Sequence, residues 1–168
     1  MDLTDRTVLV TGGSAGIGRA ISLAAADAGA DVVVVDLERD PRAGSTPTAE
    51  AVRERGRDSL FLEADVRDFA DLRAAVDAGA ELGTLDGVVN NAGVAESYAI
   101  TETSADNWRR SVQTNLTGVY HGCRAGVEAM LAGDSGAIVN IASGAGVVGL
   151  VNSCSYSAAK GGVISLTR

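Results

Sequence analysis

The stretch RTVLVTGGSAGIGRAISLAAADAGADVVVVD, residues 6–36, places a glycine-rich turn inside two alternating hydrophobic patterns. Residues 6–12 and 31–36 are short apolar runs rich in valine, which are typical of buried β-strands. Residues 16–29 between them have helical periodicity. A strand, a helix and a second strand in this order predict a βαβ unit, in which the two strands run parallel.

The same alternation continues along the rest of the sequence. Further strands are predicted at residues 59–65, 85–93 and 136–143, and further helices at residues 48–56, 69–82, 104–131 and from 153 onward. The strands are almost continuously apolar, as expected when helices cover both faces of a parallel sheet. We therefore predict a single α/β domain over residues 1–168, built on a Rossmann-like, doubly wound parallel sheet.

Composition restricts the class of protein. The formal net charge of −8 argues against a nucleic acid as the main partner, because phosphate binding needs a basic face. No apolar run approaches the roughly 20 residues that a membrane span needs, and the N-terminus lacks the basic start of a secretory signal. Cys123 and Cys154 lack metal-like spacing and are expected to be free thiols. We therefore expect a cytoplasmic protein that binds neither membranes nor nucleic acids.

Two conspicuous residues have a structural interpretation. His121 is the only histidine, so the chain offers few residues for Ser-His-Asp catalysis or for a metal site with several histidines. We therefore expect no metal. A histidine on a helix is usually a packing or surface residue, and we expect this of His121. Trp108 is expected to anchor helix packing rather than to form a platform for a substrate.

Gly12, Gly16 and Gly18 lie where the first predicted strand turns into the first helix. Glycines there let the backbone turn sharply and approach a pyrophosphate, and the helix N-terminus offers free N–H groups. The spacing G-x-x-x-G-x-G differs from the usual dinucleotide pattern, and the absence of a following Lys-Ser/Thr pair argues against a P-loop. On its own, the loop fits a dinucleotide site and a tight turn equally well.

Asp36 ends the second predicted strand, eighteen residues after Gly18. This is close to the roughly 20-residue spacing at which an acidic side chain receives the ribose hydroxyls of a dinucleotide. A carboxylate there repels the 2′-phosphate of NADP, and the nearest basic candidate for that phosphate is Arg39. NAD is therefore the expected cofactor and NADP the less favoured one; the alternative is that Asp36 is a plain loop cap.

Tyr156 and Lys160 are four residues apart, which places both side chains on one face of a helix. Tyrosine titrates at about 10 in water, so a tyrosine that acts as a base near neutral pH needs a neighbouring positive charge. Lys160 is the only lysine among fourteen basic residues, and a compact ammonium suits this task better than a guanidinium. The alternative is an ordinary contact on an amphipathic helix.

Ligands of open α/β sheets bind beyond the carboxyl ends of the strands, and each predicted strand here ends in a small or polar group. The segments TGGSAGIG (11–18), NNAG (90–93) and YSAAK (156–160), together with Ser143, resemble the short-chain dehydrogenase/reductase family in its compact, ordinary form. The resemblance covers essentially the whole chain, in order. It implies an oxidoreductase that transfers a hydride between NAD(H) and a secondary alcohol or ketone.

The resemblance also implies a role for each matching residue. Tyr156 would be the catalytic acid/base, and Lys160 would bind the nicotinamide ribose and favour ionisation of Tyr156. Ser143 would hydrogen-bond the substrate oxygen, while Asn115 would bend the long helix and hold a water in the proton relay. Besides Tyr156 and Lys160, the cofactor-binding residues would be Gly12, Ser14, Gly16, Ile17, Gly18, Asp36, Asp65, Val66, Asn90, Ala92 and Gly93.

Members of this family normally continue beyond the helix that carries YSAAK, with further strands and a loop that closes over the nicotinamide. None of these follows Arg168, so the resemblance implies a fold that lacks the family's C-terminal strands. A polypeptide that ends here is expected to expose residues 136–143 as a sheet edge, to associate and to be a weak catalyst. The alternative is that the sequence is part of a longer chain.

Three functions remain open from the sequence alone: an NAD-dependent dehydrogenase, an NAD-binding module without turnover, and an NADP-linked 3-oxoacyl-thioester reductase. The residues at 94–99 and 144–153 are mostly small and apolar, which suits a small uncharged carbonyl or alcohol substrate. The resemblance further implies a homodimer or homotetramer, paired through the helices at 104–131 and from 153 onward.

Overall fold

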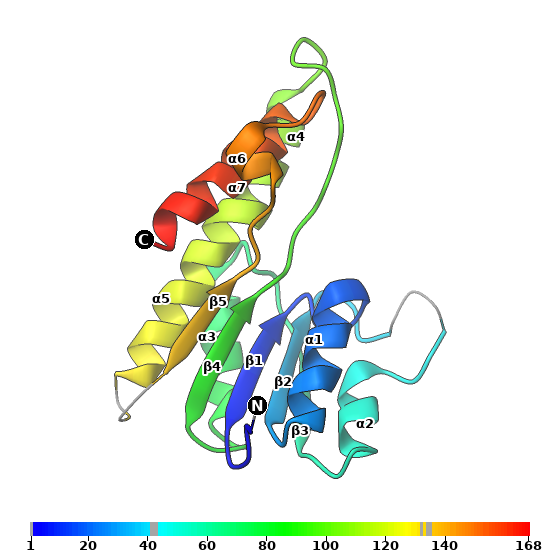
Figure 1. Ribbon diagram of the computed structural model, residues 1–168, viewed down its shortest axis with the longest axis vertical. Coiled ribbons are helices and arrows are strands. Elements are labelled where there is room, and N and C mark those ends of the chain that lie inside the picture. Colours follow the sequence, from blue (N-terminus) through cyan, green and yellow to red (C-terminus); the bar gives the residue numbers. More distant parts are fainter. Residues whose placement is uncertain (1, 41–43, 132, 134–135) are drawn as a thin grey trace.

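The computed structural model describes residues 2–40, 44–131, 133 and 136–168. Within these residues, five parallel strands form one sheet with helices against both faces, which confirms the predicted α/β fold (Figure 1). The strands are β1 (Thr7–Thr11), β2 (Asp31–Asp36), β3 (Ser59–Glu63), β4 (Leu85–Asn90) and β5 (Ala137–Asn140).

Helices fill the connections between the strands. They are α1 (Gly16–Asp27), α2 (Thr48–Arg53), α3 (Phe69–Gly79), α4 (Ala105–Val112), η1 (Gln113–Thr117), α5 (Gly118–Met130), α6 (Ala145–Val148) and α7 (Cys154–Leu166). The predicted long helix is confirmed, with the π-helical turn η1 between its halves α4 and α5. In the described ranges, no helix is long and apolar enough to cross a membrane.

Two predicted helices end three residues before the limit that the sequence pattern indicated. The helix expected at 48–56 ends at Arg53, and Gly56 follows in a left-handed conformation (φ 77°) that reverses the chain. The helix expected at 69–82 ends at Gly79, and Gly83 (φ 136°) completes the turn into β4. In both places a glycine in the left-handed region directs the chain out of the helix earlier than hydrophobic periodicity suggests.

The strand order is β3-β2-β1-β4-β5, so β1 lies at the centre of the sheet and β5 at one edge. All four pairings are parallel, with Val8 opposite Val32 and Val88 opposite Ile138, for example. The carboxyl ends of all five strands therefore lie at the same end of the sheet, its carboxyl edge. This edge is where the predicted binding residues gather.

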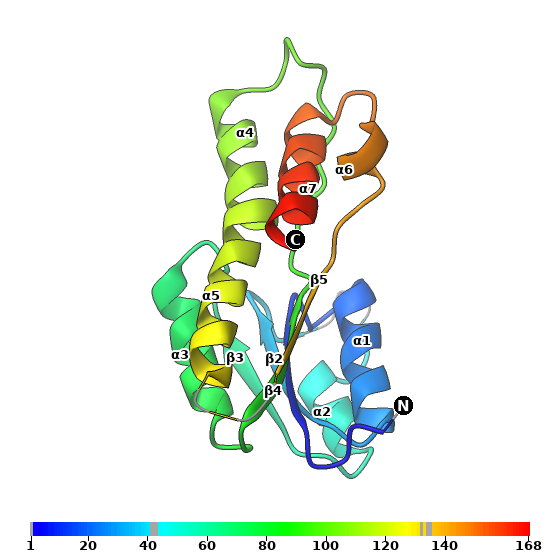
Figure 2. The same cartoon turned by 60° about the vertical axis from the view of Figure 1, so that its left-hand side comes forward.

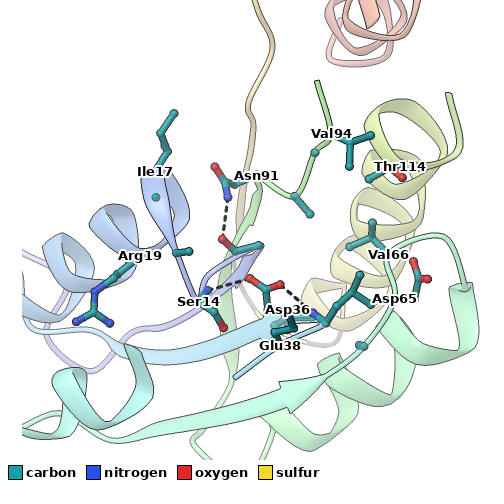
Figure 3. Close-up of a pocket in the computed structure, with 18 of the residues that line it drawn as sticks. Ser14, Ile17, Arg19, Asp36, Glu38, Asp65, Val66, Asn91, Val94 and Thr114 are labelled. Carbon is teal, nitrogen blue, oxygen red and sulfur yellow. Dashed lines mark hydrogen bonds between the residues drawn. The ribbon is translucent and has the colours of Figure 1, made fainter. Parts of the chain in front are cut away.

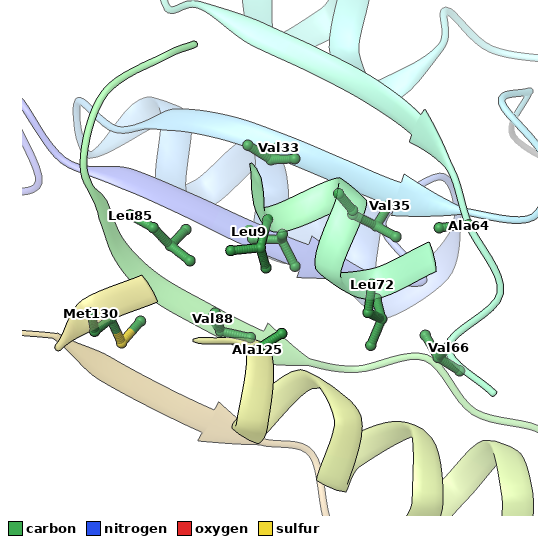
Figure 4. Close-up of a cluster of buried hydrophobic side chains, with 12 residues drawn as sticks. Leu9, Val33, Val35, Ala64, Val66, Leu72, Leu85, Val88, Ala125 and Met130 are labelled. Atoms are coloured by element: carbon green, nitrogen blue, oxygen red, sulfur yellow. The ribbon is translucent and has the colours of Figure 1, made fainter. Parts of the chain in front are cut away.

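The valine run of β2 divides its side chains between two cores, because successive residues of a strand point to opposite faces. Val33 and Val35 pack with residues of α3 and α5 (Figure 4), whereas Val32 and Val34 pack beneath α1 and α2. All four side chains are completely buried. Figure 2 shows the sheet between its two helical layers, which explains why the inner strands β1 and β2 have apolar side chains on both faces.

A glycine lets α5 lie close to β4. A Cβ at Gly122 would lie 1.9 Å from Asn90 Oδ1, so the side chain of Asn90 occupies the space that a larger residue would need. Asn90 is buried in this layer, and its Nδ2 donates to Asn140 Oδ1 (2.8 Å) and to Cys123 Sγ (3.5 Å). The amide therefore joins β4 to β5 and to α5 on the face of the sheet that α5 covers.

Helices α6 and α7 lie beyond the carboxyl edge of the sheet, beside α4 (Figures 1 and 2). Helix α7 packs on α4, on η1 and on α6. No helix was predicted between the strand at 136–143 and the helix from 153 onward, and the short helix α6 in this stretch corrects that prediction. Ser143 Oγ accepts a hydrogen bond from Ala145 N (3.1 Å), which satisfies a backbone donor at the first turn of α6.

We expect Gly122→Ala to lower the free energy of unfolding by about 1–3 kcal/mol, because the new methyl group overlaps the Asn90 amide. Urea unfolding followed by circular dichroism measures this change. Gly144→Ala is the matched control, since its Cβ meets no atom within 4 Å and its backbone is already helical. The control should stay within about 0.5 kcal/mol of wild type. Equal stability of Gly122→Ala and wild type would contradict the close packing of α5 on β4.

Candidate active site

The glycine-rich loop brings the start of α1 against the end of β1. Gly12 (φ 64°) and Gly16 (φ 54°) have left-handed backbones, which a residue with a Cβ adopts only with strain. At Gly18, a Cβ would lie 2.0 Å from Gly12 O. The spacing of the three glycines is therefore required by the backbone itself, and it leaves the loop without bulky side chains between β1 and α1.

A groove of about 850 Å³ opens beside this loop (Figure 3). It runs over the carboxyl ends of β1, β2, β3 and β4 and reaches the turn η1. Of the residues with a predicted binding role, the groove is lined by Gly12, Ser14, Gly16, Ile17, Asp36, Asp65, Val66, Ala92 and Gly93. The structure therefore brings together residues from four strand ends in one elongated site.

Asp36 is held at the rim of the groove by backbone N–H groups. Its Oδ2 accepts from Ser14 N (3.0 Å) and its Oδ1 from Leu37 N (2.8 Å). Arg39, the candidate receiver for a 2′-phosphate, instead forms an ion pair with Glu50 (2.8 Å). The carboxylate thus stands at the groove with its negative charge unpaired by Arg39.

Asp65 and Val66 form the wall of the groove at the end of β3. Arg67 binds the Asp65 carboxylate, and this hydrogen bond holds the pKa of Asp65 below its ordinary value. The backbone of Val66 is fixed from behind, because His121 Nδ1–H donates to Val66 O (2.9 Å). His121 also packs on the ring of Phe69, so the structural interpretation of this histidine is confirmed.

The two asparagines of the NNAG segment point in different directions. Asn90 does not line the groove; its buried side chain lies on the α5 side of the sheet. Asn91 does line the groove, and its Nδ2 donates to Thr11 O (2.9 Å) and Gly12 O (3.2 Å). Asn91 therefore connects the end of β4 to the glycine-rich loop, a role that was not predicted from the sequence.

Asn115 is completely buried in η1 and bonds to the segment that follows β4. Its Nδ2 donates to Val94 O (2.8 Å) and Ser111 O (3.0 Å), and its Oδ1 accepts from Val94 N (3.1 Å). The Ser111 carbonyl is four residues earlier, where the π-helical turn departs from regular α-helical hydrogen bonding. The side chain of Asn115 thus bonds within the irregular turn and holds Val94, which lines the groove.

Lys160 is buried, and its Nζ donates to Ile141 O (2.7 Å), just beyond the end of β5. Burial disfavours the ammonium form and lowers the pKa of Lys160 from its ordinary value. The Nζ lies 5.8 Å from the centre of the Tyr156 ring, and Tyr156 is half-buried on the same helix. The i, i+4 spacing has therefore brought the pair together, as predicted.

The residues that line the groove do not include Ser143, Asn115, Tyr156 or Lys160. The groove ends at Val94, Arg110 and Thr114, and Asn115 is joined to Val94. Within the described residues, no hydrogen bond joins the side chains of Ser143, Tyr156 and Lys160. Asn115 lies in η1, Ser143 precedes α6, and Tyr156 and Lys160 lie on α7, which packs on both η1 and α6.

The sequence matches the family model for short chain dehydrogenases over residues 6–168. The chain belongs to the short-chain dehydrogenase family. Two relatives are cis-4-hydroxycyclohexanecarboxylate dehydrogenase of Sinomonas cyclohexanicum, 43% identical over 98% of this chain, and (-)-trans-carveol dehydrogenase of Rhodococcus erythropolis, 39% identical over 97%. The chain spans 65% and 63% of the length of these relatives.

A solved short-chain dehydrogenase has the same fold. The carveol dehydrogenase from Mycobacterium avium in complex with NAD superposes with a TM-score of 0.92 at 34% identity. The match covers 99% of this chain and 64% of that protein. The family and the fold inferred from the sequence motifs are therefore confirmed.

Several residues that line the groove were not among the predicted binding residues. They are Ala15, Arg19, Val35, Leu37, Glu38, Asp40, Ser45, Ala64, Arg67, Asn91, Val94, Arg110 and Thr114. Asn91 had a signal, because it belongs to the quoted NNAG segment. Arg110 and Thr114 had none, since their contribution depends on how α4 and η1 approach the sheet.

The lowered pKa of Lys160 has a consequence for stability. Between the folded pKa and the ordinary value of 10.5, the unfolded chain binds a proton that the folded chain does not, so the stability contributed by Lys160 rises with pH. We expect the unfolding free energy of wild type, relative to Lys160→Met, to increase as the pH rises toward 10.5. Urea unfolding at several pH values measures this difference.

Arg109→Met is the control for this comparison, because it removes an exposed group that stays charged over the whole range. Its stability relative to wild type should be the same at every pH. A difference between wild type and Lys160→Met that is also constant with pH would contradict the desolvation of the ammonium.

Proposed function

We propose that this protein is an NAD-dependent dehydrogenase or ketone reductase that transfers a hydride between NAD(H) and a secondary alcohol or ketone. The observation that carries the proposal is the chain's only lysine. Lys160 is buried beside Tyr156 on α7, with one of its three N–H groups directed at Ile141 O. Burying an ammonium is costly, and a site that retains one at this position suits proton transfer by a neighbouring tyrosine.

Two features of the groove support NAD as the cofactor. Ser14 Oγ is buried and has no hydrogen-bond partner within the described residues, so a ligand oxygen would satisfy it. Asp36 offers a carboxylate to ribose hydroxyls, and its charge opposes a 2′-phosphate. The NAD in the carveol dehydrogenase complex from Mycobacterium avium is consistent with this assignment.

In the proposed complex, the glycine-rich loop would hold the pyrophosphate through Gly12, Ser14, Gly16, Ile17 and Gly18. The remaining binding residues would be Asp36 at the adenosine ribose, Asp65 and Val66 at the adenine, and Asn90, Ala92 and Gly93 along the strand end. Since the side chain of Asn90 is directed away from the groove, a contact with the cofactor would come from its backbone, whose carbonyl already accepts from Ile141 N (2.9 Å). When bound, NAD supplies the acceptor for the hydride.

The chain's own residues would position the substrate and move the proton. Tyr156 would remove the proton from an alcohol or donate it to a carbonyl, while Ser143 hydrogen-bonds the same oxygen. Lys160 would stabilise the phenolate through its charge and bind the nicotinamide ribose with its remaining N–H groups. Asn115 would support a water between Lys160 and solvent. These roles supply orientation and acid–base catalysis.

We propose a cyclic secondary alcohol, or the corresponding ketone, as the substrate. Both relatives named above carry ring alcohols in their names. The turn around α6 supports an apolar substrate, because it exposes a group of aliphatic side chains beside the proposed catalytic residues. These are Val147, Val148, Leu150 and Val151, and Ile100 is exposed as well.

We also propose pairing between copies of the chain and a location in the cytoplasm. Exposed apolar side chains on α4, α5 and α7 support pairing through these helices: Trp108, Val127 and Leu166. Trp108 was expected to anchor packing within the chain, but it is 44% exposed. The two cysteines are free, as predicted, and free thiols suit a reducing compartment.

Tyr156→Phe tests the catalytic proposal. We expect the full chain to reduce NAD with carveol or another cyclic secondary alcohol, and the variant to lose about 100- to 10,000-fold in kcat. Absorbance of the reduced nicotinamide measures the rate. Tyr120→Phe removes an exposed hydroxyl on α5 and should keep wild-type activity. A wild type that binds NAD but turns over no alcohol would favour the alternative of a binding module without turnover.

Asp36→Ala tests the choice of cofactor. We expect weaker binding of NAD and stronger binding of NADP, because the variant lacks both the ribose acceptor and the charge that opposes the 2′-phosphate. The change in the ratio of the two dissociation constants should be about tenfold or more, or about 1.4 kcal/mol. Isothermal titration calorimetry measures both constants. Tighter binding of NADP than NAD by wild type would instead support a 3-oxoacyl-thioester reductase.

A further inference from the structure

The backbone of Ser14 is held from two sides. Its N–H donates to Asp36 Oδ2 (3.0 Å), and its carbonyl accepts from Thr48 Oγ1 (3.0 Å). Asp36 ends β2 and Thr48 begins α2, so two different elements fix one residue of the glycine-rich loop. Figure 3 shows the hydrogen bond between Ser14 and Asp36, which both line the groove. The backbone that carries the unpartnered Oγ of Ser14 is thereby fixed.

Thr48 does not line the groove, yet its hydroxyl both donates and accepts a hydrogen bond beside the glycine-rich loop. Thr48 is 1% exposed. Its Oγ1 donates to Ser14 O and accepts from Arg19 Nη1 (2.9 Å). Arg19 lies in the first turn of α1, just after Gly18. One hydroxyl therefore links the loop, α1 and α2.

The bond from Thr48 has no substitute in the part of the chain that the structure describes, where Ser14 O accepts from no other donor. Without the Thr48 hydroxyl, this buried carbonyl would be unpaired, and the Ser14 peptide could rotate to find another donor. A loop already held in its binding conformation binds with a smaller ordering cost. The bond therefore acts on ligand affinity as well as on stability.

We infer that Thr48 is a positioning residue for the dinucleotide site: it holds the Ser14 peptide so that Ser14 Oγ and the neighbouring loop amides meet the pyrophosphate. Arg19 assists by fixing the Thr48 side chain. This assignment rests on the proposed function, because it presumes that the groove binds NAD. Thr48 itself acts only through Ser14 and touches no ligand.

Thr48→Val and Thr48→Ser test the assignment, since valine keeps the shape of threonine without the hydroxyl and serine keeps the hydroxyl. We expect the dissociation constant for NAD, measured by calorimetry on the full chain, to rise about five- to tenfold in Thr48→Val. Thr48→Ser should stay within about twofold of wild type. Hydrogen exchange of residues 12–16 without ligand should be faster in Thr48→Val than in wild type.

Thr7→Val is the matched control, because Thr7 is also buried but begins β1 at the opposite edge of the sheet. Its dissociation constant for NAD should equal that of wild type. If Thr48→Val fails to fold, Thr48→Ala provides the same comparison with less bulk in the space of the hydroxyl.

The two proposals fail in different ways. If wild type binds NAD, and the Val and Ser variants bind it equally well with unchanged exchange at residues 12–16, the assignment to Thr48 is overturned and the proposed function stands. If wild type binds no NAD, both are overturned. A lower stability of Thr48→Val with an unchanged dissociation constant would also overturn the assignment, because it would show a purely structural role.

Discussion

The backbone contact between Gly12 and Gly18 is the constraint on which the site depends. Because a Cβ at position 18 would lie 2.0 Å from Gly12 O, α1 can begin directly against the end of β1 only with glycine there. This close start leaves room beside the loop for the groove. The parallel sheet then brings the ends of β2, β3 and β4 to the same edge, where Asp36 and Asp65 line the groove.

A second set of contacts connects this groove to α7. Asn115 holds the segment after β4 by two hydrogen bonds to Val94, and it lies in the π-helical turn of the long helix. Helix α7 packs on that same turn, and Lys160 is bonded to Ile141 O beyond β5. The i, i+4 spacing on α7 thus brings the proposed catalytic pair together, and the packing of α7 on α4, η1 and α6 and the bond to Ile141 O place the pair relative to the sheet.

Most strands and helices could be predicted because the pattern of apolar residues in the sequence indicates which segments are buried. The valine run of β2 lies in a strand buried on both faces, and burial of this kind requires an uninterrupted apolar pattern. Helix ends were less predictable. Gly56 and Gly83 end their turns through positive φ angles, and hydrophobic periodicity does not report backbone conformation. Helix α6 was missed because it has only four residues.

By itself, the sequence determined the fold class, the family and the set of residues at the strand ends, because each depends on local spacing and on burial. Only the tertiary structure decided the directions of the side chains. It turned Asn90 into the α5 layer and Asn91 toward the glycine-rich loop, and it brought Thr48 to the carbonyl of Ser14. The reason is that these contacts join elements that are distant in sequence, so their geometry is set by packing between layers.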